Sequence, residues 1–504
     1  MTTTYDAVSY PTVPRALAHP GHLFAVARMF GLNPAPVATA RVLEIGCGDG
    51  GHLLACAAAM PTATFVGFDL SAEAVARGRA IARDAGLANA RIEVGDITNW
   101  DAGGEPFDYI IADGIYSWIP APVRDALVAL TSRSLAPNGV AFFSYNVFPG
   151  CYTRKMLWEM MKYHVRGIDE PERQIDEALR MADFVRVCRR KTTLGKHDLF
   201  DRDVDNVLNK RVRNILFHDE LSPVNEPTYI HKFARHVADH GLRFVSEAMP
   251  QSMGFTTLPA AVREKIRAFA GSDPIKREQY VDFASLRRFR QSLVVRADRT
   301  PAAEPIASNI RELLVGGIAR PDSVDLAPGA PMTFRVDDTA FTIRTPLTKA
   351  ALVVLGEHQP DRLTFDELLA TALTKLGRTT AESNEVEELI GELTTAWNAG
   401  GLLLKGFQPR WSKTISDRPV ASPLARAQLR SGPMATSLLH TTVQFEDAPS
   451  RMLVQLLDGT RTVERIAAEL LPMFPPEHRP SPADFRVGLD RNLAMLAANG
   501  FLVG

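Results

Sequence analysis

The sequence has few cysteines and no long apolar run, and its charges almost cancel. Four cysteines occur in 504 residues and none are spaced as C-x-x-C, so we expect neither a disulfide framework nor a cysteine-based zinc cluster. No apolar stretch approaches the ~20 residues of a membrane-spanning helix. The net charge of -1 gives no general attraction to nucleic acid or acidic lipid. The first 15 residues show no signal-peptide pattern, so we expect a cytoplasmic protein without stable membrane insertion.

Residues 41–146 alternate short apolar runs with helical segments. The runs "RVLEIG", "TFVGFDLS", "ARIEVGDIT", "FDYIIADG" and "VAFFSYN" are typical of buried parallel strands. Between them we expect helices, one capped by Ser71 and another ending at Asn138–Gly139. The pattern predicts an α/β fold with a Rossmann-like, doubly wound sheet, whose ligands bind at the carboxyl ends of the strands.

A glycine motif follows the first strand. In "LEIGCGDGG", Gly46, Gly48 and Gly51 have the spacing G-x-G-x-x-G, which is typical of a turn that lies against a nucleotide. The motif alone does not distinguish a nicotinamide dinucleotide from S-adenosylmethionine.

Four acids at four successive strand ends distinguish between these two candidate ligands. Asp69 suits the hydroxyls of a ribose in either one. Glu44, beside the glycines, would repel a pyrophosphate but attract the ammonium group of S-adenosylmethionine. Asp96 suits the adenine amino group, and Asp113 lies where the sulfonium is expected. The set predicts S-adenosyl-L-methionine rather than NAD or FAD.

These motifs resemble the class I S-adenosylmethionine-dependent methyltransferases. The resemblance implies a seven-stranded sheet whose last two strands we place at 242–248 and 289–298, after helix 227–241. The core would therefore comprise residues 1–149 and 226–300. The expected cofactor-binding residues are Glu44, Gly46, Cys47, Gly48, Asp69, Leu70, Asp96, Ile97, Asp113 and Gly114.

Two insertions interrupt the expected sheet. Residues 150–225 predict three helices, which could be a solvated helical pair, a dimerising arm or a lid. A shorter insertion spans 250–288. His236 and His240 share one face of the helix before strand six, but the glutamate of an H-E-x-x-H pattern is missing between them. We therefore expect them to complement the helix dipole rather than to bind a metal.

The second half contains an internal repeat. After a linker and a short β element at 301–340, the segments 341–406 and 407–504 each show three helices and a final "AGGLLL" or "NGFLV" strand, the outline of a winged helix. Residues 341–405 hold six Lys/Arg and nine Asp/Glu, a net of -3. Phosphate binding needs a basic surface, so we expect protein contacts and no nucleic acid. We also expect that residues 330–504 can be removed without loss of cofactor binding.

Further segments narrow the resemblance. "YDAVSYPTVPRALAHPGHLF", "ADGIYSWIPAPVRDAL", "SYNVFPG", "FHDELSPVNEPTYIHKF" and "VASPLARAQLRSG" resemble a bacterial group with a methyltransferase regulatory domain. This group includes protein-lysine methyltransferases that modify outer-membrane proteins. The resemblance implies a protein or peptide substrate and an acceptor pocket lined by Tyr116, Trp118 and Asn146. Cys151 departs from the bulkier aromatic expected after "FPG".

The acceptor itself stays open between hypotheses. Lysine methylation needs a neutral amine, and aromatic rings such as Tyr116 and Trp118 can hold its cationic form before transfer. Trp118 could instead pack its own loop against the domain. A small-molecule O- or N-methyltransferase is one alternative, and a non-catalytic S-adenosylmethionine-binding module is another. A homodimer is also left open.

Overall fold

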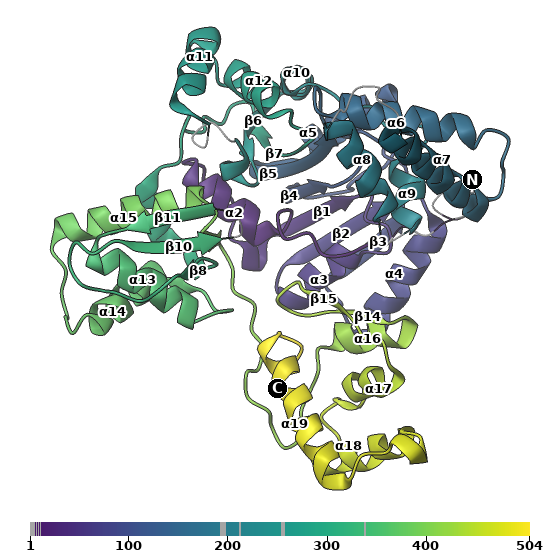
Figure 1. Cartoon of the computed structure of the whole chain (residues 1–504), viewed down its shortest axis with the longest axis vertical. Helices are drawn as coiled ribbons and strands as arrows, with labels where there is room; N and C mark the ends of the chain where they lie inside the picture. Colours follow the sequence, from purple (N-terminus) through teal and green to yellow (C-terminus); the bar gives the residue numbers. More distant parts are fainter. Residues whose placement is uncertain are drawn as a thin grey trace.

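The computed structural model describes residues 6, 8, 10, 12–191, 198–210, 213–253, 258–336 and 339–503. A seven-stranded sheet forms the centre of the body, and the C-terminal part of the chain, drawn in yellow, forms a unit at the bottom of Figure 1. Within the described ranges, no helix is long and apolar enough to cross a bilayer.

The sheet has the order β3-β2-β1-β4-β5-β7-β6, and β7 runs antiparallel to both β5 and β6. This confirms the seven-stranded Rossmann-like prediction. The strands are β1 (Arg41–Ile45), β2 (Thr64–Asp69), β3 (Ala90–Val94), β4 (Phe107–Ala112), β5 (Leu135–Asn146), β6 (Leu242–Glu247) and β7 (Phe289–Arg296).

Helices cover both faces of the sheet because its strands are apolar on both sides. Val42 of β1 joins the core under α2, α3 and α4, whereas Leu43 joins the core under α5 and α10. These helices and the short η1 are α2 (Pro20–Met29), η1 (Val37–Thr39), α3 (Gly51–Ala59), α4 (Ala72–Asp84), α5 (Ala121–Ser134) and α10 (Ile230–Asp239).

Local signals at the helix ends were partly informative. Ser71 caps α4 as predicted, since its Oγ accepts from the Ala74 N–H at 3.1 Å. The predicted end of α5 at Asn138–Gly139 is wrong, because the helix ends at Ser134. Leu135 is buried and already pairs with Phe107 of β4, so the chain enters the sheet five residues before the predicted strand begins at Val140.

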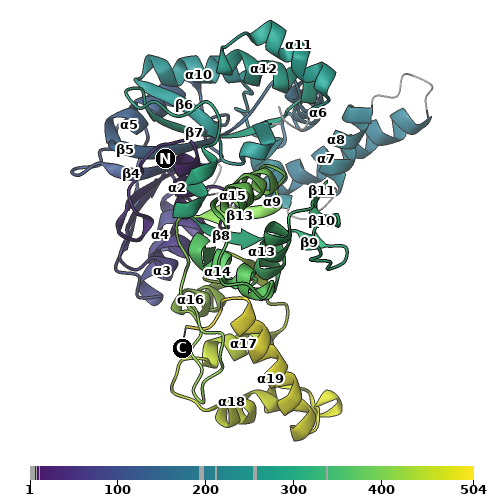
Figure 2. The ribbon, with the colours of Figure 1, turned by 90° about the vertical axis from the view of Figure 1, so that its left-hand side faces the viewer.

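The first insertion forms a helical unit with its own apolar core, in which Trp158, Met161 and Ile175 are buried. The third predicted helix is divided into α8 and α9. Figure 2 shows α7 and α8 extending outward from the body. The helices are α6 (Cys151–His164), α7 (Pro171–Lys191), α8 (Asp198–Leu208) and α9 (Arg213–Asp219).

The second insertion is fastened to the sheet by a buried arginine. Arg290 of β7 is paired with Glu247 at 2.7 Å, Asp282 at 2.8 Å and Glu278 at 3.1 Å. A buried charge is tolerated when it is paired in this way, so the cluster fixes α12 against β6 and β7. The elements are η2 (Pro250–Met253), α11 (Ala260–Ala270) and α12 (Pro274–Ser285).

The short β element predicted at the end of segment 301–340 is present as the strands Met332–Val336 and Thr339–Ile343, but the part before it is not only a linker. It contains β8, which is buried between β12 (Leu363–Thr364) and β13 (Leu402–Lys405) of the next unit. Its short apolar run, "LVGG", carries too little pattern to identify a central strand. The elements are η3 (Ala307–Glu312), β8 (Leu314–Gly317), β9 (Arg320–Pro321), β10 (Met332–Val336) and β11 (Thr339–Ile343).

The first repeat forms the predicted helices and strand and is joined to the methyltransferase-like body. The Lys405 Nζ donates to the Ala16 carbonyl at 3.2 Å, and the Gly406 N–H donates to the Gly21 carbonyl at 2.7 Å. One apolar core runs from Ala18 to Ala427. Removal of residues 330–504 would expose part of this core, and its effect on cofactor binding stays a prediction. The elements are α13 (Pro346–Glu357), β12 (Leu363–Thr364), α14 (Phe365–Lys375), α15 (Ser383–Asn398) and β13 (Leu402–Lys405).

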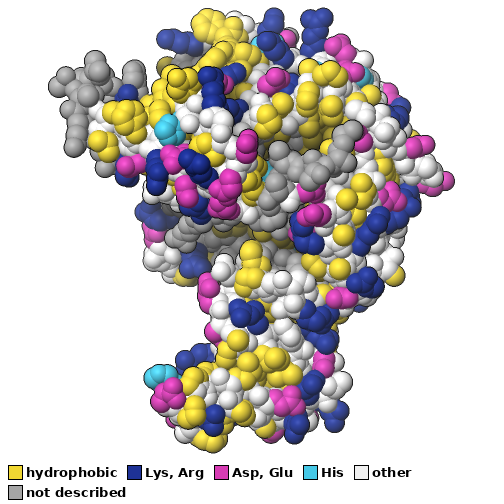
Figure 3. Space-filling model, turned by 90° about the vertical axis from the view of Figure 1, so that its right-hand side faces the viewer, with side chains coloured by type: hydrophobic (Ala, Val, Ile, Leu, Met, Phe, Trp, Pro, Cys, Tyr) yellow, Lys and Arg dark blue, Asp and Glu magenta, His cyan; other side chains and the backbone are white. Residues whose placement is uncertain are grey.

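The second repeat keeps the three helices but not the full final strand, which is reduced to a bridge between Ala421 and Leu502. Charges of both signs are mixed over the face of this unit in Figure 3, and α16 packs against α4 of the body. The elements are α16 (Pro423–Ser431), β14 (Met434–Thr436), β15 (Thr442–Gln444), α17 (Ala448–Leu456), α18 (Val463–Leu470), η4 (Leu471–Met473), η5 (Pro476–His478) and α19 (Pro482–Ala498).

Candidate active site

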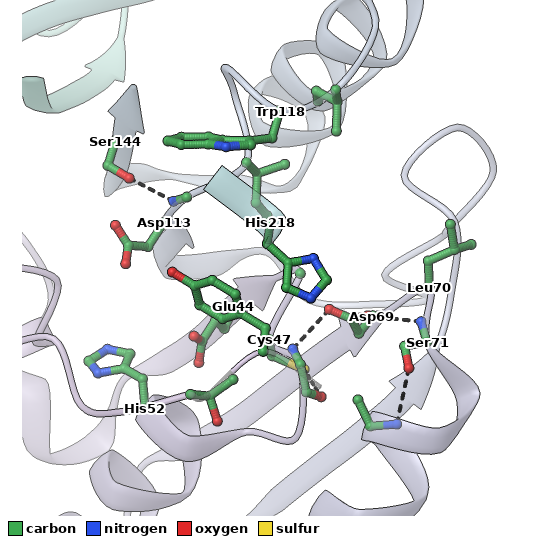
Figure 4. A pocket seen from close by; sticks show the side chains of 18 of the residues that line it. Glu44, Cys47, His52, Asp69, Leu70, Ser71, Asp113, Trp118, Ser144 and His218 are labelled. Carbon is green, nitrogen blue, oxygen red and sulfur yellow. Dashed lines mark hydrogen bonds between the residues drawn. The ribbon is translucent and has the colours of Figure 1, made fainter. Parts of the chain in front are cut away.

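A cavity of about 470 Å³ lies at the carboxyl ends of β1, β2, β4 and β5 (Figure 4). The chain turns away from the sheet at this edge, so side chains from successive strand ends converge there. The cavity is lined by all ten residues that the sequence predicted for a cofactor: Glu44, Gly46, Cys47, Gly48, Asp69, Leu70, Asp96, Ile97, Asp113 and Gly114.

The glycine turn after β1 needs its glycines. Gly46 and Gly48 have φ angles of 69° and 56°, a region that other residues rarely adopt. A Cβ on Gly46 would also lie 2.3 Å from the Ile115 Cδ1. The turn is therefore held close to the loop after β4, with its backbone along the cavity.

Asp69 at the end of β2 stabilises this turn. Its Oδ2 accepts from the Gly48 N–H at 2.9 Å and its Oδ1 accepts from the Ser71 N–H at 2.8 Å. Burial raises the pKa of Asp69, while these hydrogen bonds oppose the rise. Each carboxylate oxygen can accept a second hydrogen bond, so the side chain keeps acceptor capacity on the cavity side.

Glu44 of β1 is an incompletely satisfied buried acid. It is 8% exposed, and its Oε2 has no hydrogen-bond partner among the described residues. Burial raises the pKa of Glu44 well above its usual value, and the nearby carboxylate of Asp113 adds to the rise. A buried carboxylate oxygen without a partner costs free energy unless a ligand supplies a donor. The site therefore suits a ligand with a cationic N–H group.

The charges around the cavity favour a cation. The lining has six carboxylates and three arginines, namely Glu44, Asp49, Asp69, Asp96, Asp113 and Asp219 against Arg15, Arg77 and Arg154. One arginine is already paired, because the Arg15 Nε lies 3.3 Å from the Asp113 Oδ2. The field inside the cavity is therefore negative.

Trp118 and Asn146, two of the three predicted acceptor residues, line the cavity. Figure 4 shows the indole of Trp118 on the Asp113 side of the cavity. The backbone N–H of Trp118 donates to the Ile115 carbonyl at 2.8 Å, which closes a tight turn. Ser117 precedes Trp118 in this turn. Its Oγ accepts from the backbone N–H of Asn146 at 2.9 Å and so connects the turn to β5.

Tyr116 is not brought to the cavity, so its predicted place in the acceptor pocket does not fit. Its ring is 3% exposed and packs among Phe143, Tyr145 and Phe233. Its hydroxyl lies 2.8 Å from the His236 Nδ1. Within the tight turn, Tyr116 and Trp118 point to opposite sides of the loop.

Sequence reasoning missed the residues that close the cavity from outside the sheet. Thr12 and Arg15 come from the N-terminal segment, and the Thr12 Oγ1 accepts from the Gly51 N–H at 3.0 Å. His218 and Asp219 come from α9, so the first insertion contributes to the cavity wall. The close approach of Thr12 to Gly51 explains the third glycine of the motif. Neither segment has a local pattern that reveals this contact.

Three domain families match separate parts of the chain. A "Methyltransferase domain" matches residues 42–139, a "Predicted methyltransferase regulatory domain" matches 212–296, and a "PKMT, C-terminal winged helix domain" matches 417–474. The third match agrees with the winged-helix-like outline of the second repeat.

Relatives match over much of the chain. The chain is 29% identical over 485 residues to the uncharacterized protein RP789 of Rickettsia prowazekii, covering 93% of this chain and 85% of that protein. It is 31% identical over 230 residues to the uncharacterized protein RP028 of the same organism, covering 46% and 92%. The structure of PKMT2 from Rickettsia typhi covers 98% of this chain and 100% of its own, with a TM-score of 0.82 and 24% identity. A second structure of PKMT2, in complex with AdoHcy, gives a TM-score of 0.83.

Together, the sheet order, the acidic cavity at its carboxyl edge and the matched domains define a class I S-adenosylmethionine-dependent methyltransferase. The chain belongs to the family of methyltransferases that carry a methyltransferase regulatory domain. S-adenosylmethionine is its cofactor, and the partnerless oxygen of Glu44 fits the ammonium group of that molecule.

Proposed function

We propose that the enzyme transfers the methyl group of S-adenosylmethionine to the side-chain nitrogen of lysine in a protein substrate. The observation that carries this proposal is the combination of an acidic cavity with the Trp118 indole on its wall. Such a wall attracts a cationic amine and can hold it by cation–π contact. The name of the matched C-terminal domain and the fold shared with PKMT2 support a protein substrate.

The cofactor would be held by the strand-end acids. We assign Glu44 to its ammonium group, Asp69 to the ribose hydroxyls and Asp96 to the adenine amino group. Arg15 can pair with its carboxylate, in exchange for part of its present contact with Asp113. When bound, the cofactor supplies an electrophilic methyl group on a sulfonium.

The acceptor side of the cavity would be formed by Trp118 and Asn146. The Asn146 Nδ2 donates to the Asn225 Oδ1 at 2.9 Å, which orients the amide and leaves its carbonyl oxygen to accept from an amine N–H. Orientation of the reactants can account for up to ~7–11 kcal/mol of a barrier in favourable cases. Trp118 and Asn146 therefore need to align the acceptor amine with the methyl group and to favour the neutral form of that amine.

Cofactor binding should depend on pH through Glu44. Its pKa is raised by burial, and only the ionised carboxylate attracts the ammonium group. Affinity should be full above this raised pKa and should fall as the pH is lowered through it. Calorimetry with AdoHcy over a series of pH values measures this slope. In Glu44→Gln the slope should be largely lost, and an identical slope in that variant would contradict the assignment.

The methylation rate should rise with pH if lysine is the acceptor. A free lysine amine has a pKa of about 10.4, and only the neutral amine attacks the methyl group. Burial beside Trp118 and the positive cofactor should lower the pKa of the bound amine. We expect kcat/KM for a protein acceptor to increase from neutral to alkaline pH; a flat profile would oppose rate-determining attack by lysine.

The chemical class of acceptor can be tested by transfer of a radiolabelled methyl group into a bacterial lysate, followed by separation of protein from small molecules. We expect label in protein. Label confined to small molecules would contradict the proposal and favour a small-molecule methyltransferase.

We further propose that the two winged-helix-like units contact the protein substrate. The first of these units, residues 341–406, shares an apolar core with the catalytic body.

A further inference from the structure

Two helices that lie behind the Trp118 loop bring three metal-ligating side chains together. Asp125 lies on α5, His236 lies in the last turn of α10, and His240 is its C-cap. The Asp125 Oδ1 is 2.8 Å from the His240 Nε2 and 3.4 Å from the His236 Nε2. One ligand atom from each residue lies within 4.8 Å of the others. The acid next to the two histidines thus comes from a different helix, α5, and not from the segment between them.

These distances fit a small divalent ion. Zinc bonds to nitrogen and oxygen are about 2.0–2.2 Å, so two ligands at a tetrahedral angle are roughly 3.4 Å apart. Both imidazoles already face one carboxylate oxygen, so small side-chain rotations would bring the three ligands around one ion. The Asp125 side chain is 64% exposed, and solvent can therefore complete the coordination.

Tyr116 orients one of the ligands. The His236 Nδ1 lies 2.8 Å from the buried Tyr116 hydroxyl. When this nitrogen donates to the hydroxyl, the His236 Nε2 carries the lone pair that a metal requires. Metal-bound histidines usually make such a second hydrogen bond, which fixes the ring and its tautomer.

The surrounding charges permit a cation at this position. His236 and His240 lie at the C-terminal end of α10, where the helix dipole favours positive charge. Arg124 is the neighbouring cation, and its guanidinium is engaged by the Tyr116 carbonyl at 2.8 Å and by the Glu226 carboxylate at 3.0 Å. Its charge is therefore partly compensated by Glu226.

We propose that Asp125, His236 and His240 form a binding site for a divalent metal ion of the zinc class. Two imidazoles and one carboxylate suit zinc better than magnesium or calcium, which prefer oxygen ligands. A bound ion would fasten α10 to α5 and, through the hydrogen bond to Tyr116, would stiffen the turn that presents Trp118.

A second group of potential ligands fits a metal less well. His19, Cys56 and His440 also bring three donor atoms together. However, the His19 Nδ1 accepts from the Gly21 N–H at 2.9 Å, so the neutral ring carries its proton on Nε2. The His19 Nε2 can bind a metal only if its proton moves to Nδ1, and the hydrogen bond from the Gly21 N–H is then lost.

The proposal is tested by titration of the full-length protein with Zn²⁺ in a calorimeter, after removal of metals with a chelator. We expect one ion per chain. Direct ligands should matter at least as much as outer residues, whose loss weakens metal binding by about 10–100-fold. Asp125→Asn and His240→Gln should therefore each weaken Zn²⁺ binding at least about tenfold. Zn²⁺ should also raise the melting temperature of the wild type but not that of Asp125→Asn.

Two variants serve as matched controls. His164→Gln alters an exposed histidine that lies 3.3 Å from Glu177, and His440→Gln alters the second ligand group. Both should bind Zn²⁺ as the wild type does. AdoHcy binding verifies that every variant is folded. The proposal is overturned if the wild type does not bind Zn²⁺, if Asp125→Asn and His240→Gln keep wild-type affinity, or if only His440→Gln loses it.

Discussion

Replacement of Glu44 by glutamine should weaken S-adenosylmethionine binding more than any other single change in the cavity. Glu44 is buried, and its Oε2 has no partner among the described residues. If it pairs with the ammonium group, the substitution leaves a buried charge unpaired, which typically destabilises by about 3–5 kcal/mol. This corresponds to a loss of affinity of more than about 100-fold, measurable by calorimetry with AdoHcy.

Glu73→Gln is the matched control for this variant. Glu73 is an exposed carboxylate in the first turn of α4 and does not line the cavity. It should change the overall charge as Glu44→Gln does but leave the affinity within about twofold of wild type, because exposed charges interact weakly. Equal affinities of the Glu44 variant and the wild type would refute the role of Glu44.

Replacement of Trp118 by alanine should reduce methyl transfer far more than cofactor affinity. The indole lines the cavity and is held by a tight turn, so its loss should misalign the acceptor amine. Small errors in alignment can reduce rates by about 100-fold. We expect a decrease of that order in kcat/KM for a protein acceptor.

Two measurements separate this role of Trp118 from simple packing. The affinity for AdoHcy should stay close to that of the wild type, and Trp118→Phe should restore much of the activity because a phenyl ring also holds a cationic amine. Equal losses of cofactor affinity and turnover would indicate that Trp118 only supports its loop.

The sequence predicted which strand-end acids meet at the cavity, because the geometry of a parallel sheet determines their positions. Glu44, Asp69, Asp96 and Asp113 each lie at or next to the end of a strand, and parallel strands place their carboxyl ends on one edge. All four therefore line the same cavity. The four acids are far apart in the sequence, but each belongs to a successive βα unit, and every such unit brings the end of its strand to the same edge of the sheet.

The acceptor side was less predictable because it depends on turn geometry and on distant segments. Tyr116 and Trp118 are two residues apart, yet a tight turn directs one into the core and the other to the cavity. Thr12, Arg15 and His218 reach the cavity through tertiary contacts that leave no local pattern. The same holds for Asp125, which meets His236 and His240 only because α5 packs beside α10.

The most direct test of the proposed function is to map the transferred methyl group by mass spectrometry on proteins modified by the purified enzyme. We expect added methyl groups on the side-chain nitrogen of lysine in the wild-type reaction, greatly reduced with Glu44→Gln and with Trp118→Ala. Methylation of carboxylate, glutamine or arginine side chains, with lysine unmodified, would contradict it.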